Sequence, residues 1–241
     1  MNEHQADPDQ LPLVRDELDV LGDLVPLAGQ RIIELGCGNA RLARSLVLRH
    51  AGSQVVGLEV DAVQHTKNVS SPQERLLFVA GSAEAVPFPD AGFDGAMMLK
   101  SLHHVPLDGM DAALAEVARV VKPGGWFYVS EPIFGGALNE IVRLYNDENT
   151  VRRAAQAALD EVERTAARDG NHATWLRKCY AESGSVQGVV AAAVTTAVMM
   201  RHPSRLQQLL AQLSQHQQCR HQLFRNLWCP HHLLDRARCY P

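Results

Sequence analysis

The sequence lacks any apolar run long enough to cross a membrane, which takes about 20 residues. Its first residues are polar and acidic, without the basic start and apolar stretch of a signal peptide. Its five cysteines are an odd number for a disulfide framework. The formal net charge of −4 gives no overall attraction to nucleic acid. These absences predict a cytoplasmic protein with reduced thiols and neither a membrane nor a nucleic acid as partner.

The last part of the chain lacks lysine and almost lacks acidic residues. No acidic residue occurs between Glu182 and Asp235, and no lysine follows Lys178. Residues 201–241 are instead rich in His, Gln, Arg and Cys. Two interpretations of this basic tail stay open: an aberrant end, frameshifted or disordered, or a helical appendage for oligomerisation such as a homodimer.

What is present is a regular alternation of strands and helices. Short apolar strands are predicted over 31–35, 54–58, 76–79, 93–99 and 126–130, and helices over 11–25, 40–50, 61–69 and 107–121. This alternation predicts an α/β fold: a doubly wound, mostly parallel sheet with helices on both faces, Rossmann-like. We divide the chain into a core over 1–135 with its N-terminal helix, a helical substrate or cover segment over 136–200, and the tail.

The first predicted strand ends in a turn with two glycines, Gly36 and Gly38. In open α/β sheets, ligands bind at the carboxyl ends of the strands. Two features disfavour a dinucleotide here: Arg41 stands where its fingerprint needs Gly or Ala, and the Glu34 carboxylate would repel a pyrophosphate. The same carboxylate would attract a ligand that carries an ammonium and a sulfonium, as S-adenosylmethionine does.

Two further strand ends carry groups suited to adenosine. Glu59 follows the second strand, where a carboxylate can accept hydrogen bonds from both ribose hydroxyls, each worth about 1.5–3 kcal/mol. This feature is common to dinucleotide and S-adenosylmethionine folds and does not discriminate between them. After the third strand, residues 81–84 can offer a backbone N–H and a short side chain to the adenine edge.

Six segments, in order, resemble the motifs of class I S-adenosylmethionine-dependent methyltransferases. They are residues 32–38, 56–59, 81–90, 93–94, 102–105 and 121–125. The resemblance covers about residues 20–135 and is strongest to the small-molecule, ubiquinone/menaquinone-type subfamily (methyltransferase type 11). It implies methyl transfer from S-adenosylmethionine to a small-molecule acceptor, with S-adenosylhomocysteine as product.

The resemblance also implies roles for single residues. The cofactor-binding positions are Glu34, Gly36, Cys37 and Gly38 at the methionine part, Glu59 at the ribose, Val60, Ser82 and Ala83 at the adenine, and Lys100 beside cofactor and substrate. Ala40 stands where the family often has a third glycine. Ser82 stands where it usually has Asp, and we therefore expect weaker anchoring of the adenine.

A general base is needed only if the methyl acceptor is protonated, as a phenol or a carbon acid is. The candidates are His103 and His104, because histidine titrates near neutral pH. The alternative is that one caps the following loop while the other packs against the cofactor. Glu131 either contacts substrate or caps the turn at Pro132. Cys37 is interpreted as a small residue fitted into the turn rather than a nucleophile.

Three other functions are weighed against this one. The first is a non-catalytic domain that binds an S-adenosylmethionine-type ligand, and the second is an NAD-dependent oxidoreductase, which Arg41 and Glu34 disfavour. The third is a nucleic-acid methyltransferase, which only the basic tail supports. No metal site is predicted, because the tail cysteines lack C-x-x-C spacing and His231 and His232 are adjacent.

Overall fold

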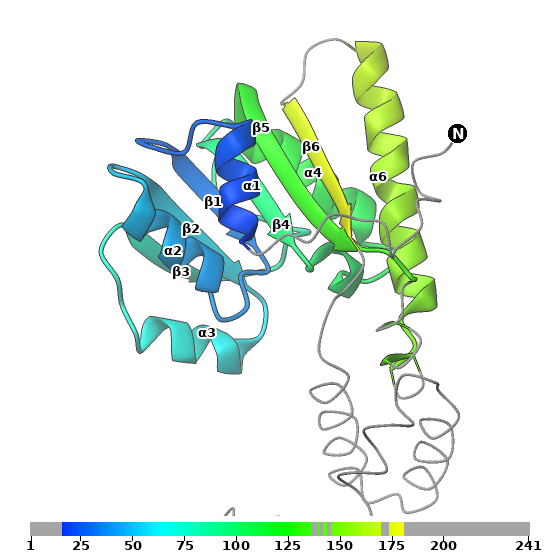
Figure 1. The fold of residues 1–241 in the computed structure, drawn as a ribbon, viewed down its shortest axis with the longest axis horizontal. Coiled ribbons are helices and arrows are strands. Elements are labelled where there is room, and N and C mark those ends of the chain that lie inside the picture. Colours follow the sequence, from blue (N-terminus) through cyan, green and yellow to red (C-terminus); the bar gives the residue numbers. More distant parts are fainter. Residues whose placement is uncertain (1–15, 136–138, 140–141, 144–145, 170–173, 181–241) are drawn as a thin grey trace, which may run out of the picture. The chain divides into compact units, whose positions relative to one another are not determined.

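The computed structural model describes residues 16–135, 139, 142–143, 146–169 and 174–180. Six strands form one sheet in the order β3-β2-β1-β4-β5-β6, and all neighbouring strands pair in parallel (Figure 1). The strands are β1 (Arg31–Leu35), β2 (Gln54–Glu59), β3 (Leu76–Ala80), β4 (Phe93–Leu99), β5 (Val121–Pro132) and β6 (Thr174–Tyr180). The helices are α1 (Glu17–Leu24), α2 (Arg41–Arg49), α3 (Ala62–Val69), the 3-10 helix η3 (Leu102–His104), α4 (Met110–Val120) and α6 (Asn149–Asp169).

The predicted fold class, a doubly wound parallel sheet with helices on both faces, is confirmed. Side chains cap the starts of α1 and α3: Asp16 accepts from the amide of Leu18, and Asp61 accepts from the amides of Val63 and Gln64. β5 is longer than predicted. Its first residue, Val121, already pairs with Phe93, and the register shifts before the pairs that start at Trp126.

The expectation of a helical segment over 136–200 holds for α6 but not for residues 174–180. These residues form β6, which pairs in parallel with β5 from Trp126↔Thr174 to Pro132↔Tyr180. β6 therefore extends the sheet beyond β5 from within a segment that was expected to be helical. Predictions for residues 11–15, 187–200 and the tail over 201–241 fall outside the described residues.

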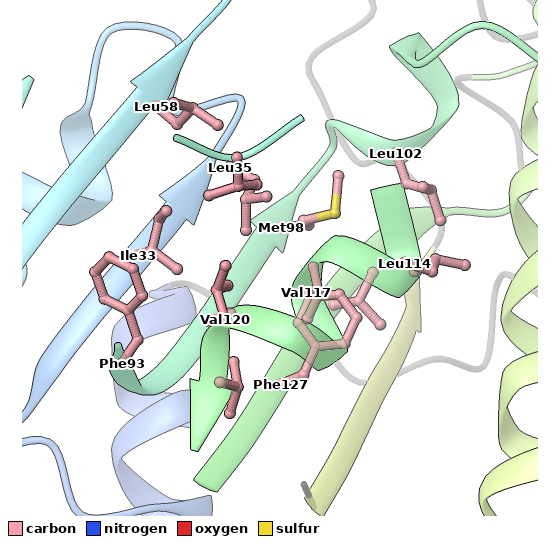
Figure 2. Close-up of a cluster of buried hydrophobic side chains, with 14 of the residues drawn as sticks. Ile33, Leu35, Leu58, Phe93, Met98, Leu102, Leu114, Val117, Val120 and Phe127 are labelled. Carbon is pink, nitrogen blue, oxygen red and sulfur yellow. The ribbon is translucent and has the colours of Figure 1, made fainter. Parts of the chain in front are cut away.

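Alternating side chains of the strands divide the core between the two faces of the sheet. On β1, Ile33 and Leu35 belong to the cluster that α4 and α6 cover, whereas Ile32 belongs to the cluster that α1 and α2 cover. Figure 2 shows the first cluster, in which side chains of β1, β2, β4 and β5 meet Leu114 and Val117 of α4. Burial on both faces is what parallel strands require.

By its internal contacts the chain divides into two compact units. The sheet and its helices belong to the first, Met1–Phe134 with Thr150–Tyr180. In the second, the structure describes a short turn in which the amide of Arg143 donates to the carbonyl of Asn139. No helix in the described part of the chain is both long and apolar enough to span a membrane.

Candidate active site at the carboxyl ends of the strands

The turn after β1 has the backbone conformation that its glycines predict. Gly36 and Gly38 have φ of +69° and +51°, in the left-handed region that favours glycine. A Cβ on Gly36 would lie 2.7 Å from the Cβ of Ser101, which follows β4. Ala40, where the family often has glycine, adopts the same region with φ of +56°. The turn thus brings the ends of β1 and β4 into close contact.

The amide groups of this turn are already bonded within the protein. Those of Gly36 and Cys37 both donate to the carbonyl of Leu58, at 2.9 and 3.0 Å. The amide of Gly38 donates to Oε2 of Glu59 at 2.7 Å. In dinucleotide folds such amides face a pyrophosphate, whereas here they hold the turn against β2.

The first amides of α2 are occupied as well. The Asn39 side chain accepts from the amide of Arg41 at 3.2 Å. The backbone amide of Ala43 bonds to the carboxyl group of Glu34. A phosphate bound at this helix end would have to displace both oxygens, so the local geometry disfavours the NAD-dependent alternative.

Glu34 is buried beneath the turn, with 4% of its surface exposed. Burial raises the pKa of its carboxyl group to about 8, the Ala43 amide and Arg41 lower it, and Glu59 raises it further. Among the described residues its Oε2 has no hydrogen-bond partner. Glu34 therefore offers a buried, unpartnered acceptor to a ligand that brings a positive charge.

Glu59 lies at the end of β2 beside an exposed apolar side chain. Its carboxylate is 7% exposed and also accepts from the amide of Asp61 at 2.9 Å. Each carboxylate oxygen can accept more than one hydrogen bond, so capacity for ribose hydroxyls remains. Val60, which is 73% exposed, offers an apolar surface next to it.

At the end of β3, the Ser82 hydroxyl donates to Oε2 of Glu84 at 2.8 Å and accepts from the Glu84 amide at 3.2 Å. Its hydrogen is therefore committed, and its remaining lone pair can only accept. A carboxylate is thus present here, two residues after the position where the family usually has one. Ala83 packs against the core.

Cys37 contributes to packing rather than to chemistry. Its Sγ lies 2.9 Å from where a Cβ on Gly57 would stand, and the Asn68 side chain donates to it at 3.7 Å. Burial raises the pKa of this thiol to about 12, which disfavours a nucleophile. Because the Cys37 amide is bonded to Leu58, only the carbonyl of this residue, which accepts from the Ala40 amide at 2.8 Å and can accept a second bond, remains suited to the predicted cofactor contact.

The segment after β4 contains a buried polar cluster. Nδ1 of His103 lies 2.5 Å from Oε2 of Glu131, and both side chains are almost fully buried. Oε1 of Glu131 accepts from the amides of Ser101 and Leu102 at 3.0 and 2.8 Å. The ring of His104 is exposed and lies 4.2 Å from that of His103, centroid to centroid.

The structure therefore groups the predicted residues at three neighbouring places. Glu34, the glycine turn, Glu59 and Val60 lie at the ends of β1 and β2, Ser82 and Ala83 follow β3, and Lys100, His103 and His104 follow β4. Lys100 has φ of +57°, and its amide donates to Ser130 at 2.9 Å. The described part contains no group of three side chains arranged for a metal.

Two supporting residues were not predicted as site residues. Asn68 of α3 is buried and donates to the carbonyl of Gly38 at 2.7 Å, which fixes the turn. Glu131 was expected either to contact substrate or to cap the turn at Pro132, and its side chain lies against His103 and the amides of Ser101 and Leu102. Its position directly after the predicted strand over 126–130 was the signal, but His103 lies 28 residues away in the chain.

Comparison with known proteins agrees with this geometry. Residues 33–129 match the family model described as a methyltransferase domain. The chain is 33% identical to a fatty-acid O-methyltransferase of Mycolicibacterium smegmatis over 43% of this chain and 37% of that protein. It is 32% identical to the 27-O-demethylrifamycin SV methyltransferase of Amycolatopsis mediterranei over 44% of this chain and 40% of that protein.

The chain thus spans about two fifths of the length of these curated relatives. It also resembles the solved structure of an S-adenosylmethionine-dependent methyltransferase from Mesorhizobium loti, at 24% identity over 46% of this chain and 50% of that chain, with a TM-score of 0.38. By sequence, residues 33–129 of the chain match a methyltransferase domain.

Proposed function

We propose that this chain transfers a methyl group from S-adenosylmethionine to a small-molecule acceptor and releases S-adenosylhomocysteine. The observation that supports this most directly is that a turn whose amides are already bonded lies above the buried Glu34. The amides of Gly36, Cys37 and Gly38 are bonded internally, while Oε2 of Glu34 has no partner among the described residues. A cationic ligand fits such a place better than a phosphate does.

The residues at each strand end are assigned to a different part of S-adenosylmethionine. We assign Glu34 and the turn to the methionine ammonium, and Glu59 to the ribose hydroxyls. Val60, Ser82 and Ala83 frame the adenine, and Lys100 borders cofactor and substrate. When bound, S-adenosylmethionine supplies a methyl group on a positively charged sulfur, which is a good leaving group. The protein has to hold the acceptor in line and exclude water.

The two histidines after β4 differ in how well they suit a general base. His103 is buried and held at Nδ1, whereas His104 is exposed. A base has to be held in a fixed orientation toward the proton it removes. We therefore assign the base to His103 and the packing role to His104.

Calorimetric titration tests the cofactor assignment. We expect S-adenosylmethionine to bind the full chain and NAD not to bind. Glu59→Gln should weaken S-adenosylmethionine binding at least tenfold, because a charge-assisted hydrogen bond is worth about 1.5–3 kcal/mol. Glu74→Gln changes an exposed carboxylate before β3 and is the matched control. Binding of NAD instead of S-adenosylmethionine would exclude the proposal.

Turnover separates an enzyme from a non-catalytic binding domain. Formation of S-adenosylhomocysteine with a panel of small-molecule acceptors supports the enzyme, and tight binding without product supports the binding domain. The curated relatives are themselves named for small-molecule acceptors, which supports that class over nucleic acid. A cytoplasmic location and a homodimer remain predictions from the sequence. Size-exclusion chromatography with light scattering measures whether the chain is a homodimer.

A further inference from the structure

Glu131 and His103 come from different elements and meet in the interior. Glu131 lies near the end of β5, and His103 lies in η3 after β4. Their side chains are 1% and 4% exposed, and the Oε2–Nδ1 distance is 2.5 Å. A buried polar contact this short is favourable only if its donor and acceptor are matched.

The other oxygen of Glu131 fixes its orientation. Oε1 accepts from two successive backbone amides, those of Ser101 and Leu102. The carboxylate therefore cannot rotate without leaving two buried donors unpaired. Oε2 stays directed at the ring of His103.

This orientation determines where the imidazole carries its hydrogen. A carboxylate can only accept, so the hydrogen of this bond lies on Nδ1 of His103. In the neutral ring, Nε2 then carries the lone pair. Among the described residues, Nε2 makes no hydrogen bond that would consume this lone pair.

We propose that Glu131 is a positioning residue that holds His103 in the tautomer whose Nε2 accepts the proton of the methyl acceptor. This inference rests on the proposed function. The acceptor class that it serves is a hydroxyl group or an acidic carbon, which has to lose a proton as it is methylated. The acceptor's O–H or C–H bond breaks, its electrons form the bond to the methyl carbon, and the proton moves to Nε2. The carbon–sulfur bond breaks with its electrons on sulfur, and Glu131 balances the positive charge of the imidazolium.

Glu131→Gln tests the assignment with little change of shape. Its amide oxygen can keep the two backbone hydrogen bonds, which leaves the amide nitrogen facing Nδ1 of His103. Because that nitrogen is a donor, Nδ1 has to become the acceptor and the hydrogen moves to Nε2. The variant therefore reverses the tautomer while preserving the turn.

The readout is nitrogen NMR of the full chain with ¹⁵N-labelled histidine, recorded at alkaline pH with S-adenosylhomocysteine added. The His103 signals are assigned by their loss in His103→Gln. We expect the Nδ1–H tautomer in the wild type and the Nε2–H tautomer in Glu131→Gln. Glu116→Gln, which alters the partly exposed ion pair with Arg119, should leave the wild-type pattern.

Two results would overturn the inference: the Nε2–H tautomer in the wild type, which needs no variant to fold, or an unchanged tautomer in Glu131→Gln. Calorimetry with S-adenosylmethionine on the same samples reports the proposed function separately. We expect the dissociation constant of Glu131→Gln to stay within about threefold of wild type. Loss of binding in the wild type would contradict the proposed function and leave the tautomer result as its own test.

Discussion

Gly36 and Ser101 lie in contact across the ends of β1 and β4, with only 2.7 Å between the Ser101 Cβ and the place of a Cβ on Gly36. The Ser101 hydroxyl also donates to the carbonyl of Leu35 at 2.8 Å. The turn that holds the proposed cofactor and the segment that leads to His103 are therefore packed directly against each other.

We predict that Gly36→Ala destabilises the protein by about 2–5 kcal/mol. Left-handed backbone costs a non-glycine residue about 1–2 kcal/mol, and overpacking adds about 1–3 kcal/mol. Gly29→Ala separates the two effects, because Gly29 has φ of +72° but nothing within 4 Å of an added Cβ. Urea unfolding measures both variants. Equal losses in the two would show that the contact with Ser101 has no cost.

The second prediction concerns pH. Because the pKa of Glu34 is raised from 4.5 to about 8 by folding, the native state binds more protons than the unfolded state between these values. The stability of the ligand-free protein should therefore fall as pH rises through this window, by up to about 1.4 kcal/mol per unit. Glu34→Gln should flatten the dependence, and the exposed Glu74→Gln should not. Unfolding midpoints across pH 5–8 check this, and an unchanged slope in Glu34→Gln would contradict it.

The raised pKa of Glu34 also predicts that binding of S-adenosylmethionine releases a proton. An ammonium beside Glu34 favours the ionised carboxylate, so binding should release a proton below about pH 8. Calorimetry in two buffers with different ionisation enthalpies measures that proton. We expect its release to be lost in Glu34→Gln, whereas release equal to that of wild type would assign the proton to another group.

The third prediction concerns adenine anchoring. Ser82→Asp alone should gain little affinity, because the new carboxylate would face Glu84, to which the Ser82 hydroxyl now donates at 2.8 Å. Ser82→Asp combined with Glu84→Gln removes this repulsion. The double variant should bind S-adenosylmethionine about tenfold more tightly, as expected from one charge-assisted hydrogen bond. Titration of both variants decides between them, and a full gain in Ser82→Asp alone would show that Glu84 exerts no repulsion.

The fourth prediction concerns the N-terminal helix. The buried Tyr128 hydroxyl donates to the Glu17 side chain and ties α1 to β5. Burial, and next the bond to Glu17, raise the pKa of this phenol. Tyr128→Phe should lower the free energy of unfolding by about 1 kcal/mol. Glu17→Gln keeps an acceptor oxygen and should lose less in the same urea titration, so an equal or larger loss in Glu17→Gln would argue against this contact.

Most of the sheet could be predicted because its strands are short apolar runs with turn residues between them. β1 to β4 each contain at least two consecutive apolar residues, and each is followed by glycine, a charged residue or proline within a few positions. β6 was missed because its run contains Arg177 and Lys178 and has no alternating pattern. Pairing with β5, a non-local interaction, determines its structure.

The site could be predicted as far as position along a strand determines it. Glu34, the two glycines and Glu59 lie at the ends of β1 and β2, as the rule that ligands bind at the carboxyl ends of parallel strands led us to expect, and their contact with a ligand stays a prediction. The commitment of the turn amides to Leu58 and Glu59 could not be read from the sequence, because it depends on how β1 and β2 are aligned. The contact of His103 with Glu131 could not be read from the sequence either, because it depends on how β4 and β5 are aligned.

The order of the strands separates the residues that we assign to the methyl donor from those that we assign to removal of the acceptor's proton. β1, β2 and β3 end at the groups assigned to the donor, while β4 and β5 end at His103 and Glu131. Related proteins could therefore methylate different acceptors through changes in the chain beyond β5, while the residues at the ends of β1, β2 and β3 stay the same. Because Gly36 and Ser101 touch where the two halves meet, substitutions on either side of that contact would have to remain compatible with each other.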